Sequence, residues 1–150
     1  MNTGRRTFAL LVAAVVFALP LQARAQHAQT VTVYKSATCG CCGEWVKHLQ
    51  SNGFKVEAHD VADLDPVKQK LGVRRELASC HTATVGGYTI EGHVPASDIR
   101  RLLAERPKDA KGLAVPGMPV GSPGMETGPA QPYATMLFDK AGGTRVFARH

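Results

Sequence analysis

The chain has 150 residues, of which 44% are hydrophobic and 20% are charged, and its formal net charge is +6 at pH 7. This length predicts one domain with a modest core, which excludes a mini-protein that depends on disulfides for its stability. No stripe of Lys and Arg is interleaved with aromatic residues, so the positive charge does not predict a nucleic-acid partner.

The N-terminal segment, residues 1–25, has the layout of a secretory signal peptide. Arg5 and Arg6 precede fourteen uncharged residues at positions 8–21, and a small-x-small cleavage site ends at Ala25. A bilayer span needs about 20 apolar residues, so a membrane anchor is the weaker interpretation. We therefore expect export, by the general or the twin-arginine route, with cleavage near Ala25 and no stable membrane insertion afterwards.

The rest of the chain alternates between strand and helix patterns. Two alternating apolar runs each precede a helical pattern, and two further strands flank the turn-forming pair Gly86-Gly87. The predicted order, β-α-β-α-β-β-α with a C-x-x-C motif at the first strand-to-helix turn, resembles the thioredoxin fold over residues 30–106. We therefore expect an α/β fold with a thioredoxin-like core. After a loose tail at 26–29, the expected elements are strands at 30–34, 54–61, 82–85 and 88–90 and helices at 41–51, 65–72 and 97–106.

Three of the four cysteines lie at that first strand-to-helix turn, at Cys39, Cys41 and Cys42. Thiolates at this place are stabilised by free backbone N–H groups and by the positive end of the helix dipole. Redox enzymes with the thioredoxin fold carry a cis-proline before the third strand, but the corresponding place here, residues 79–81, holds Cys80. The expected fold therefore brings Cys80 beside the other three cysteines.

Residues 107–132 contain six prolines and five glycines, which predicts a loop that is not a packed element. Met118 and Met125 each follow a Pro-Gly pair in this loop. Their side chains either fill gaps under a surface-covering loop or donate thioether sulfur to a soft metal ion. Residues 133–150 are expected to form a terminal β-hairpin that extends the sheet of the same domain.

The cysteine cluster admits four uses. Contiguous soft thiolates suit several Cu(I) ions, whereas a zinc site usually uses two separate knuckles and an iron–sulfur site uses a different spacing. A dithiol oxidoreductase needs no third thiol, and structural disulfides are disfavoured because Cys41 and Cys42 are adjacent. Copper is the preferred interpretation; disulfide exchange, another metal and a structural disulfide remain open.

Two histidines are candidates for the same site. His81 adjoins Cys80, and His93 ends a strand that returns towards the cluster. Both are candidates for copper ligands or for donors next to the ligands, and a structural role explains either equally well. The remaining histidines belong to no constellation; these are His27, His48, His59 and His150.

Several separate motifs follow the pattern of one known family. They are Cys39-x-Cys41-Cys42-x-x-Trp45, Ser79-Cys80-His81, Gly92-His93-Val94-Pro95 and the Gly-Met-Pro-Val-Gly-Ser-Pro-Gly-Met segment at 117–125. Over residues 30–148 the chain resembles the CopG-type copper-resistance family of exported, thioredoxin-like, copper-binding proteins. The resemblance implies a periplasmic copper site on the cysteines, of one or several ions, with copper-export or chaperone components of the periplasm as partners. It also implies cycling between Cu(I) and Cu(II), which leaves a copper oxidoreductase activity open.

The sequence therefore predicts a periplasmic Cu(I)-binding protein of copper resistance. The alternative is a thiol–disulfide oxidoreductase of thioredoxin type. The first function needs Cys41 and Cys80, whereas the second needs only Cys39 and Cys42. The predicted metal-site residues are Cys39, Cys41, Cys42, Cys80, His81, His93, Met118 and Met125.

Overall fold

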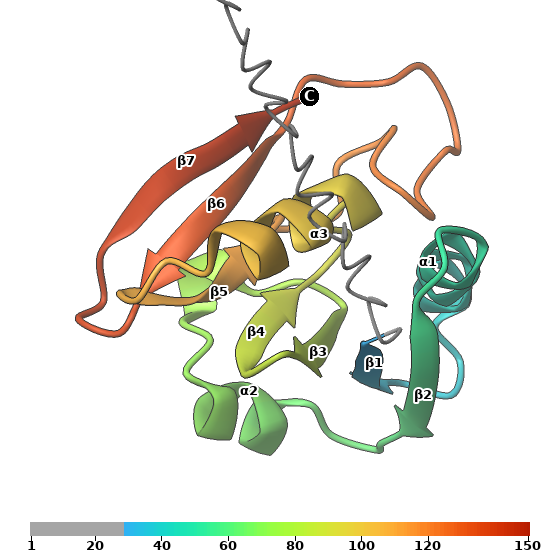
Figure 1. Cartoon of the computed structure of the whole chain (residues 1–150). Coiled ribbons are helices and arrows are strands. Elements are labelled where there is room, and N and C mark those ends of the chain that lie inside the picture. The colour runs from blue at the N-terminus through green and yellow to red at the C-terminus, as the bar shows by residue number, and fades with distance from the viewer. Residues whose placement is uncertain (1–28) are drawn as a thin grey trace, which may run out of the picture.

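One seven-stranded sheet organises the protein, with the strand order β2-β1-β3-β4-β5-β6-β7 (Figure 1). The computed structural model describes residues 29–150, so the predicted signal peptide and nearly all of the tail lie outside this part of the chain. The strands are β1 (Thr30–Lys35), β2 (Lys55–Asp60), β3 (His81–Val85), β4 (Tyr88–Glu91), β5 (Ala110–Ala114), β6 (Ala134–Asp139) and β7 (Thr144–Arg149). The helices are α1 (Gly40–Ser51), α2 (Asp65–Leu71) and α3 (Ala96–Glu105), with a 3-10 turn η1 (Arg75–Leu77). The fold is thus mixed α/β, as predicted.

The first seven helices and strands follow the predicted order, and η1 lies where the sequence predicts a short helical turn or loop, at residues 74–78. Strand β1 pairs in parallel with β2, and β3 pairs antiparallel with both β1 and β4. Gly86 and Gly87 connect β3 to β4 with φ angles of 57° and 87°. A two-residue hairpin turn with positive φ at both positions favours glycine, which explains the pair.

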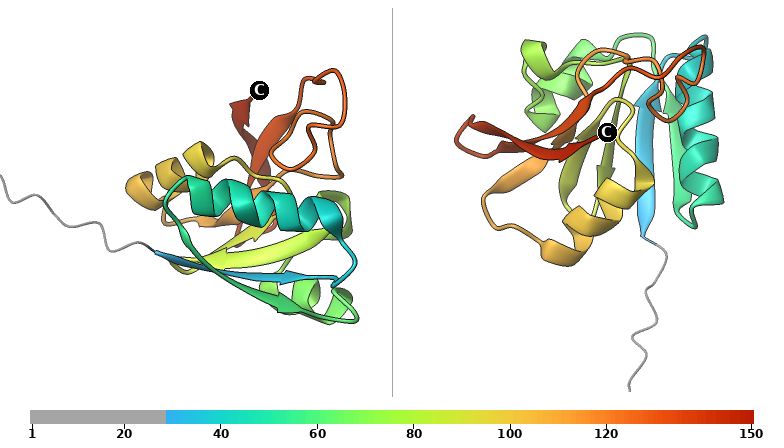
Figure 2. Two further views of the ribbon diagram at one scale, coloured as in Figure 1. Left: turned by 90° about the vertical axis from the view of Figure 1, so that its right-hand side faces the viewer. Right: turned by 90° about the horizontal axis from the view of Figure 1, so that it is seen from above.

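The helices cover both faces of the sheet. Figure 2 shows α1 and α3 on one face and α2 on the other. Trp45 and Leu49 of α1, with Ile99 and Leu102 of α3, are fully buried and recur at helical spacing. This packing of α1 against the sheet holds its first turn at the end of β1.

The prediction of a loop over residues 107–132 is wrong at its beginning. Ala110–Ala114 forms β5, which pairs in parallel with β4 and antiparallel with β6. Its central residue, Gly112, permits this close pairing, because an added Cβ would lie only 1.8 Å from the Thr89 carbonyl oxygen. The sequence did not indicate this strand, because Gly112 interrupts its short apolar run and several prolines follow it.

The remainder of the predicted loop crosses back towards α1 before the chain enters the C-terminal hairpin (Figure 1). Strands β6 and β7 pair antiparallel, as the sequence predicted, and extend the sheet beyond β5. No helix within residues 29–150 is both long enough and apolar enough to cross a membrane.

Candidate metal centre

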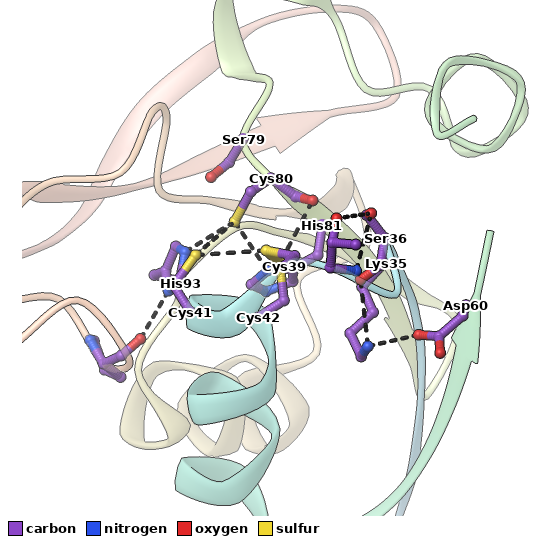
Figure 3. Close-up of a disulfide and its surroundings, with 12 residues drawn as sticks. Lys35, Ser36, Cys39, Cys41, Cys42, Asp60, Ser79, Cys80, His81 and His93 are labelled. Carbon is purple, nitrogen blue, oxygen red and sulfur yellow. Dashed lines mark hydrogen bonds and ion pairs between the residues drawn. A yellow bond between two sulfur atoms is a disulfide. The ribbon is translucent and has the colours of Figure 1, made fainter. Parts of the chain in front are cut away.

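The four cysteines meet where β1 leads into α1. Cys39 is the N-cap residue of α1, and Cys41 and Cys42 lie in its first turn. Cys80 directly precedes β3, and because β3 runs antiparallel to β1, its first residues lie beside the end of β1. The close-up in Figure 3 shows the four side chains gathered at this point.

The four sulfur atoms form one group. Each Sγ lies within 4.8 Å of every other, which confirms the prediction that Cys80 stands beside the other three. Cys39 and Cys42 form a disulfide, so the C-x-x-C pair is oxidised in this structure, whereas Cys41 and Cys80 are free. Cys41 Sγ lies 3.5 Å from Cys39 Sγ and 3.9 Å from Cys80 Sγ.

His93 approaches Cys80 with a defined tautomer. Its Nε2 lies 3.0 Å from Cys80 Sγ, and its Nδ1 lies 2.8 Å from the carbonyl oxygen of Pro123. Because a carbonyl only accepts, Nδ1 carries the proton and donates to it, which leaves the lone pair of Nε2 directed at the sulfur. This arrangement is the usual one for an imidazole that binds a metal through one nitrogen.

His81 also lies near the Cys80 sulfur, and its ring meets that of His93 edge to face, with the centroids 5.0 Å apart. Its Nδ1 is 3.4 Å from Cys80 Sγ, and its ring packs against Trp45 with the centroids 4.3 Å apart. The side chain is fully buried, and its Nε2 has no hydrogen-bond partner among the described residues. Unpaired buried nitrogens are rare, so hydrogen bonding accounts for Nδ1 of this ring but not for Nε2. Cys80, His81 and His93 form a second donor group that shares Cys80 with the cysteine group.

Burial determines the protonation of this second group. Burial, followed by the neighbouring Cys41 thiol, raises the pKa of Cys80 to about 12. Burial also lowers the pKa of His93, and it lowers the pKa of His81 well below its ordinary value. At neutral pH the metal-free centre therefore holds a protonated Cys80 thiol beside two neutral imidazoles, which are the form that binds metals.

The Pro/Gly-rich loop packs directly on the cysteine motif. Gly124 has φ of 85°, and an added Cβ would lie 2.8 Å from both the Cys41 carbonyl oxygen and the Trp45 nitrogen. Met125 follows it in the chain and is half-buried. Met118 lies elsewhere on the loop and is 51% exposed. The structure thus places the backbone next to Met125 on the first turn of α1 and leaves the Met118 side chain largely in solvent.

Two functional features were missed in the sequence. Pro123 fixes the tautomer of His93 through its carbonyl oxygen, which no sequence pattern indicates. Glu91 is fully buried at the end of β4 and forms an ion pair with Lys68 of α2. A charged residue that ends the short apolar run of β4 is the only signal that pointed to this pair.

The other described histidines have structural partners. His48 Nε2 accepts a hydrogen bond from the backbone N–H of Ala96, the first residue of α3, over 3.1 Å. His59 stacks on a tyrosine, and His150 lies within hydrogen-bond distance of a buried aspartate. His27 lies outside the described residues.

Comparison with known proteins decides the family. A structure of the copper resistance protein CopG, form 2, is 46% identical to the chain, with a TM-score of 0.77, and covers 81% of this chain and 98% of its own. The chain belongs to the CopG copper-resistance family. The form 1 structure of CopG agrees, with 47% identity, a TM-score of 0.76, and coverage of 81% of this chain and 96% of its own.

A second comparison matches residues 77–125 to a family model described as a protein of unknown function, DUF411. A search among curated proteins found no match. The DUF411 segment contains Cys80, both candidate histidines and the methionine loop, but not the cysteine motif of α1. This member of the CopG family therefore combines a cysteine cluster that could hold a metal with relatives that are copper resistance proteins.

Proposed function

We propose that this CopG-family chain is a periplasmic copper-binding protein of copper resistance that holds Cu(I) on its four cysteines. The observation that carries this proposal is the mutual distance of at most 4.8 Å among the four sulfur atoms. Thiolate sulfur is a soft donor that prefers Cu(I), and contiguous thiolates can bridge more than one ion. Copper is here the cargo of the protein.

Loading depends on the redox state of the C-x-x-C pair. In the oxidised form, the sulfurs of Cys39 and Cys42 are bonded to each other and are not thiolates. A thiol reductant that supplies two electrons and two protons, and is itself oxidised to a disulfide, converts this disulfide to two thiols, which then lose their protons on binding copper. We therefore expect the reduced protein to be the form that takes up Cu(I).

The neighbouring imidazoles broaden the donor set. His93 directs a lone pair at Cys80, and the buried His81 has its Nδ1 3.4 Å from the same sulfur. Imidazole nitrogen suits Cu(II) as well as Cu(I), so a mixed sulfur and nitrogen set supports cycling between the two oxidation states. Met118 and Met125 are proposed as additional thioether donors on the loop beside the centre.

The remaining parts of the proposal concern fold and location. The strand order β2-β1-β3-β4, with β3 antiparallel to its neighbours, supports a thioredoxin-like core. The signal-peptide layout of residues 1–25 supports export to the periplasm. Copper ions are the proposed ligand, and copper-export or chaperone components of that compartment are the proposed partners.

A second candidate function is thiol–disulfide exchange. The bonded pair Cys39–Cys42 favours it, because this is the oxidised state of a C-x-x-C oxidoreductase. That function needs neither Cys41 nor Cys80, so the two candidates differ in the residues that they require.

Anaerobic titration of the fully reduced protein with Cu(I), in competition with a chelator, tests the proposal. We expect more than one copper per chain, and an affinity at least about tenfold lower in Cys80→Ser, because even residues beside metal ligands contribute that much. The same samples are assayed for insulin reduction. No copper binding, together with insulin reduction at the rate of a thioredoxin control, would instead establish disulfide exchange.

A further inference from the structure

A buried ion pair lies on the opposite face of the sheet from the cysteine-bearing helix. Glu91, the last residue of β4, is fully buried, and Lys68 of α2 is 12% exposed. Lys68 Nζ donates to Glu91 Oε1 over 2.5 Å and to Thr82 Oγ1 over 3.0 Å. The Thr82 hydroxyl in turn donates to Glu91 Oε2 over 2.7 Å. The carboxylate is thus held on both oxygens.

The same carboxylate reaches the backbone that carries Cys80. The N–H of Ser79 donates to Glu91 Oε1 over 2.6 Å, and Ser79 immediately precedes Cys80. Residues 78–80 belong to no helix or strand, so no pairing within the sheet fixes this backbone. The segment is also bonded to η1, where the Ala78 N–H donates to the Arg75 carbonyl, and to the loop, where the Ser79 hydroxyl donates to the Gly117 carbonyl.

Stability alone does not explain an ion pair at this place. Replacing a buried ion pair with apolar residues of similar volume is often neutral or stabilising. Glu91 is fully buried and Lys68 is 12% exposed, so forming this ion pair costs the free energy of removing both charges from water. An apolar side chain would avoid that cost but would leave the N–H of Ser79, a half-buried residue, without this acceptor.

We propose that Glu91 is a positioning residue for Cys80. Its carboxylate, held by Lys68 and Thr82, accepts the hydrogen bond of Ser79 and so fixes the Cys80 sulfur near those of the other cysteines. The segment before β3 contains no proline, and in this chain the Glu91 carboxylate fixes the backbone conformation there. The inference rests on the proposed copper function for its main measurement but not for its second one.

Two matched double variants separate the hydrogen bond from the ion pair. Lys68→Met with Glu91→Leu removes both the charges and the acceptor, whereas Lys68→Met with Glu91→Gln removes the charges and keeps an acceptor. We expect the leucine variant to bind Cu(I) at least about tenfold more weakly than wild type and the glutamine variant to recover most of that loss. Circular dichroism and thermal unfolding establish that both variants are folded.

A Cys80→Ser background shows whether the effect passes through Cys80. Once that sulfur is gone, the leucine and glutamine variants should bind Cu(I) equally. Equal affinity of the two variants in the presence of Cys80, or an equal difference in its absence, would overturn the proposal.

A measurement without copper keeps this proposal separate from the proposed function. In the metal-free protein with Cys39 and Cys42 bonded, iodoacetamide labelling followed by peptide mass spectrometry gives the alkylation rates of Cys41 and Cys80. We expect Cys80 to react faster in the leucine variant than in the glutamine variant, with no change at Cys41. Wild-type protein that binds no copper would overturn the proposed function, whereas equal labelling rates of Cys80 would overturn the role of Glu91.

A milder pair of variants serves if the leucine variant does not fold. Thr82→Val removes only the hydroxyl that holds Glu91, and Thr82→Ser keeps it. The same increase in Cys80 labelling is expected in the valine variant and not in the serine variant. Equal rates in these two variants would contradict the proposal.

Discussion

Cys80 links the two donor groups of the centre. Its sulfur lies 3.9 Å from that of Cys41 and 3.0 Å from Nε2 of His93. The position of Cys80 next to the other cysteines was predictable, because the expected fold places the start of the third strand beside the first helix. The contact with His93 was not, since the carbonyl that orients this ring belongs to Pro123, thirty residues along the chain.

Copper binding through Cys80 should release a proton. Because burial raises the pKa of this thiol to about 12, it is protonated in the metal-free protein throughout the physiological range. The apparent affinity for Cu(I) should therefore rise with pH, and Cys80 alone contributes about one proton, or tenfold per pH unit. Chelator competition between pH 6 and pH 8 should show a slope that is smaller by about one proton in Cys80→Ser. Equal slopes in the two proteins would show that Cys80 keeps its proton or does not bind the metal.

At the scale of elements, local patterns predicted the helices and strands that alternate clearly. Strand β5 was missed because Gly112 lies in its centre, and a glycine is needed there only for contact with a strand distant in sequence. The Lys68–Glu91 ion pair was missed for a similar reason, since its partners lie on α2 and β4 and no spacing rule connects them. The packing of the loop on α1 likewise depends on a long-range contact at Gly124.

That contact makes Gly124 more sensitive to substitution than a neighbouring loop glycine. Gly124 and Gly117 both have positive φ, at 85° and 68°, so alanine at either position is strained by about 1–2 kcal/mol. An added Cβ at Gly124 would also lie 2.8 Å from the backbone of α1, whereas an added Cβ at Gly117 would have open space around it to 4 Å. Urea unfolding should give a lower free energy of unfolding for Gly124→Ala than for Gly117→Ala. Equal losses would indicate that the loop does not rest on α1.

The contact between α1 and α3 should make stability depend on pH. His48 accepts a hydrogen bond from the backbone N–H of Ala96. Burial lowers the pKa of His48; the negative charge of Glu126 raises it, and the positive charge of Arg100 lowers it further. His48 therefore binds a proton more readily in the unfolded chain than in the folded one. Its contribution to the free energy of unfolding is complete above pH 6.5 and is lost as the pH falls through the folded-state pKa. His48→Ala should cost about 1 kcal/mol at pH 7.5, the usual value of a side-chain acceptor at a helix N-terminus.

His48→Gln is the matched control, because an amide oxygen accepts the same hydrogen bond but does not titrate. The free energy of unfolding should decrease less between pH 7.5 and pH 5.5 in this variant than in wild type. His81 and His93 are present in both proteins, so their contributions cancel in the comparison. Identical decreases would remove His48 from the pH dependence.

At the scale of the whole molecule, one sheet brings three distant parts of the chain to one end. The turn after β1 supplies three cysteines, the segment before β3 supplies Cys80, and the loop after β5 covers them. Sequence reasoning singled out these three parts, and the copper chemistry that it assigned to them stays a prediction. It left open which sulfurs are bonded to each other, and the structure shows the pair Cys39–Cys42.

X-ray absorption at the copper edge of the reduced, Cu(I)-loaded protein tests the sulfur-held copper site most directly. We predict a first coordination shell dominated by sulfur, with a smaller sulfur contribution in Cys80→Ser. Protein that keeps its Cys39–Cys42 disulfide should retain less copper after gel filtration, because two of the four sulfurs are then not thiolates. A first shell of nitrogen and oxygen alone, or reduced protein that retains no copper, would contradict a copper site built on the cysteines.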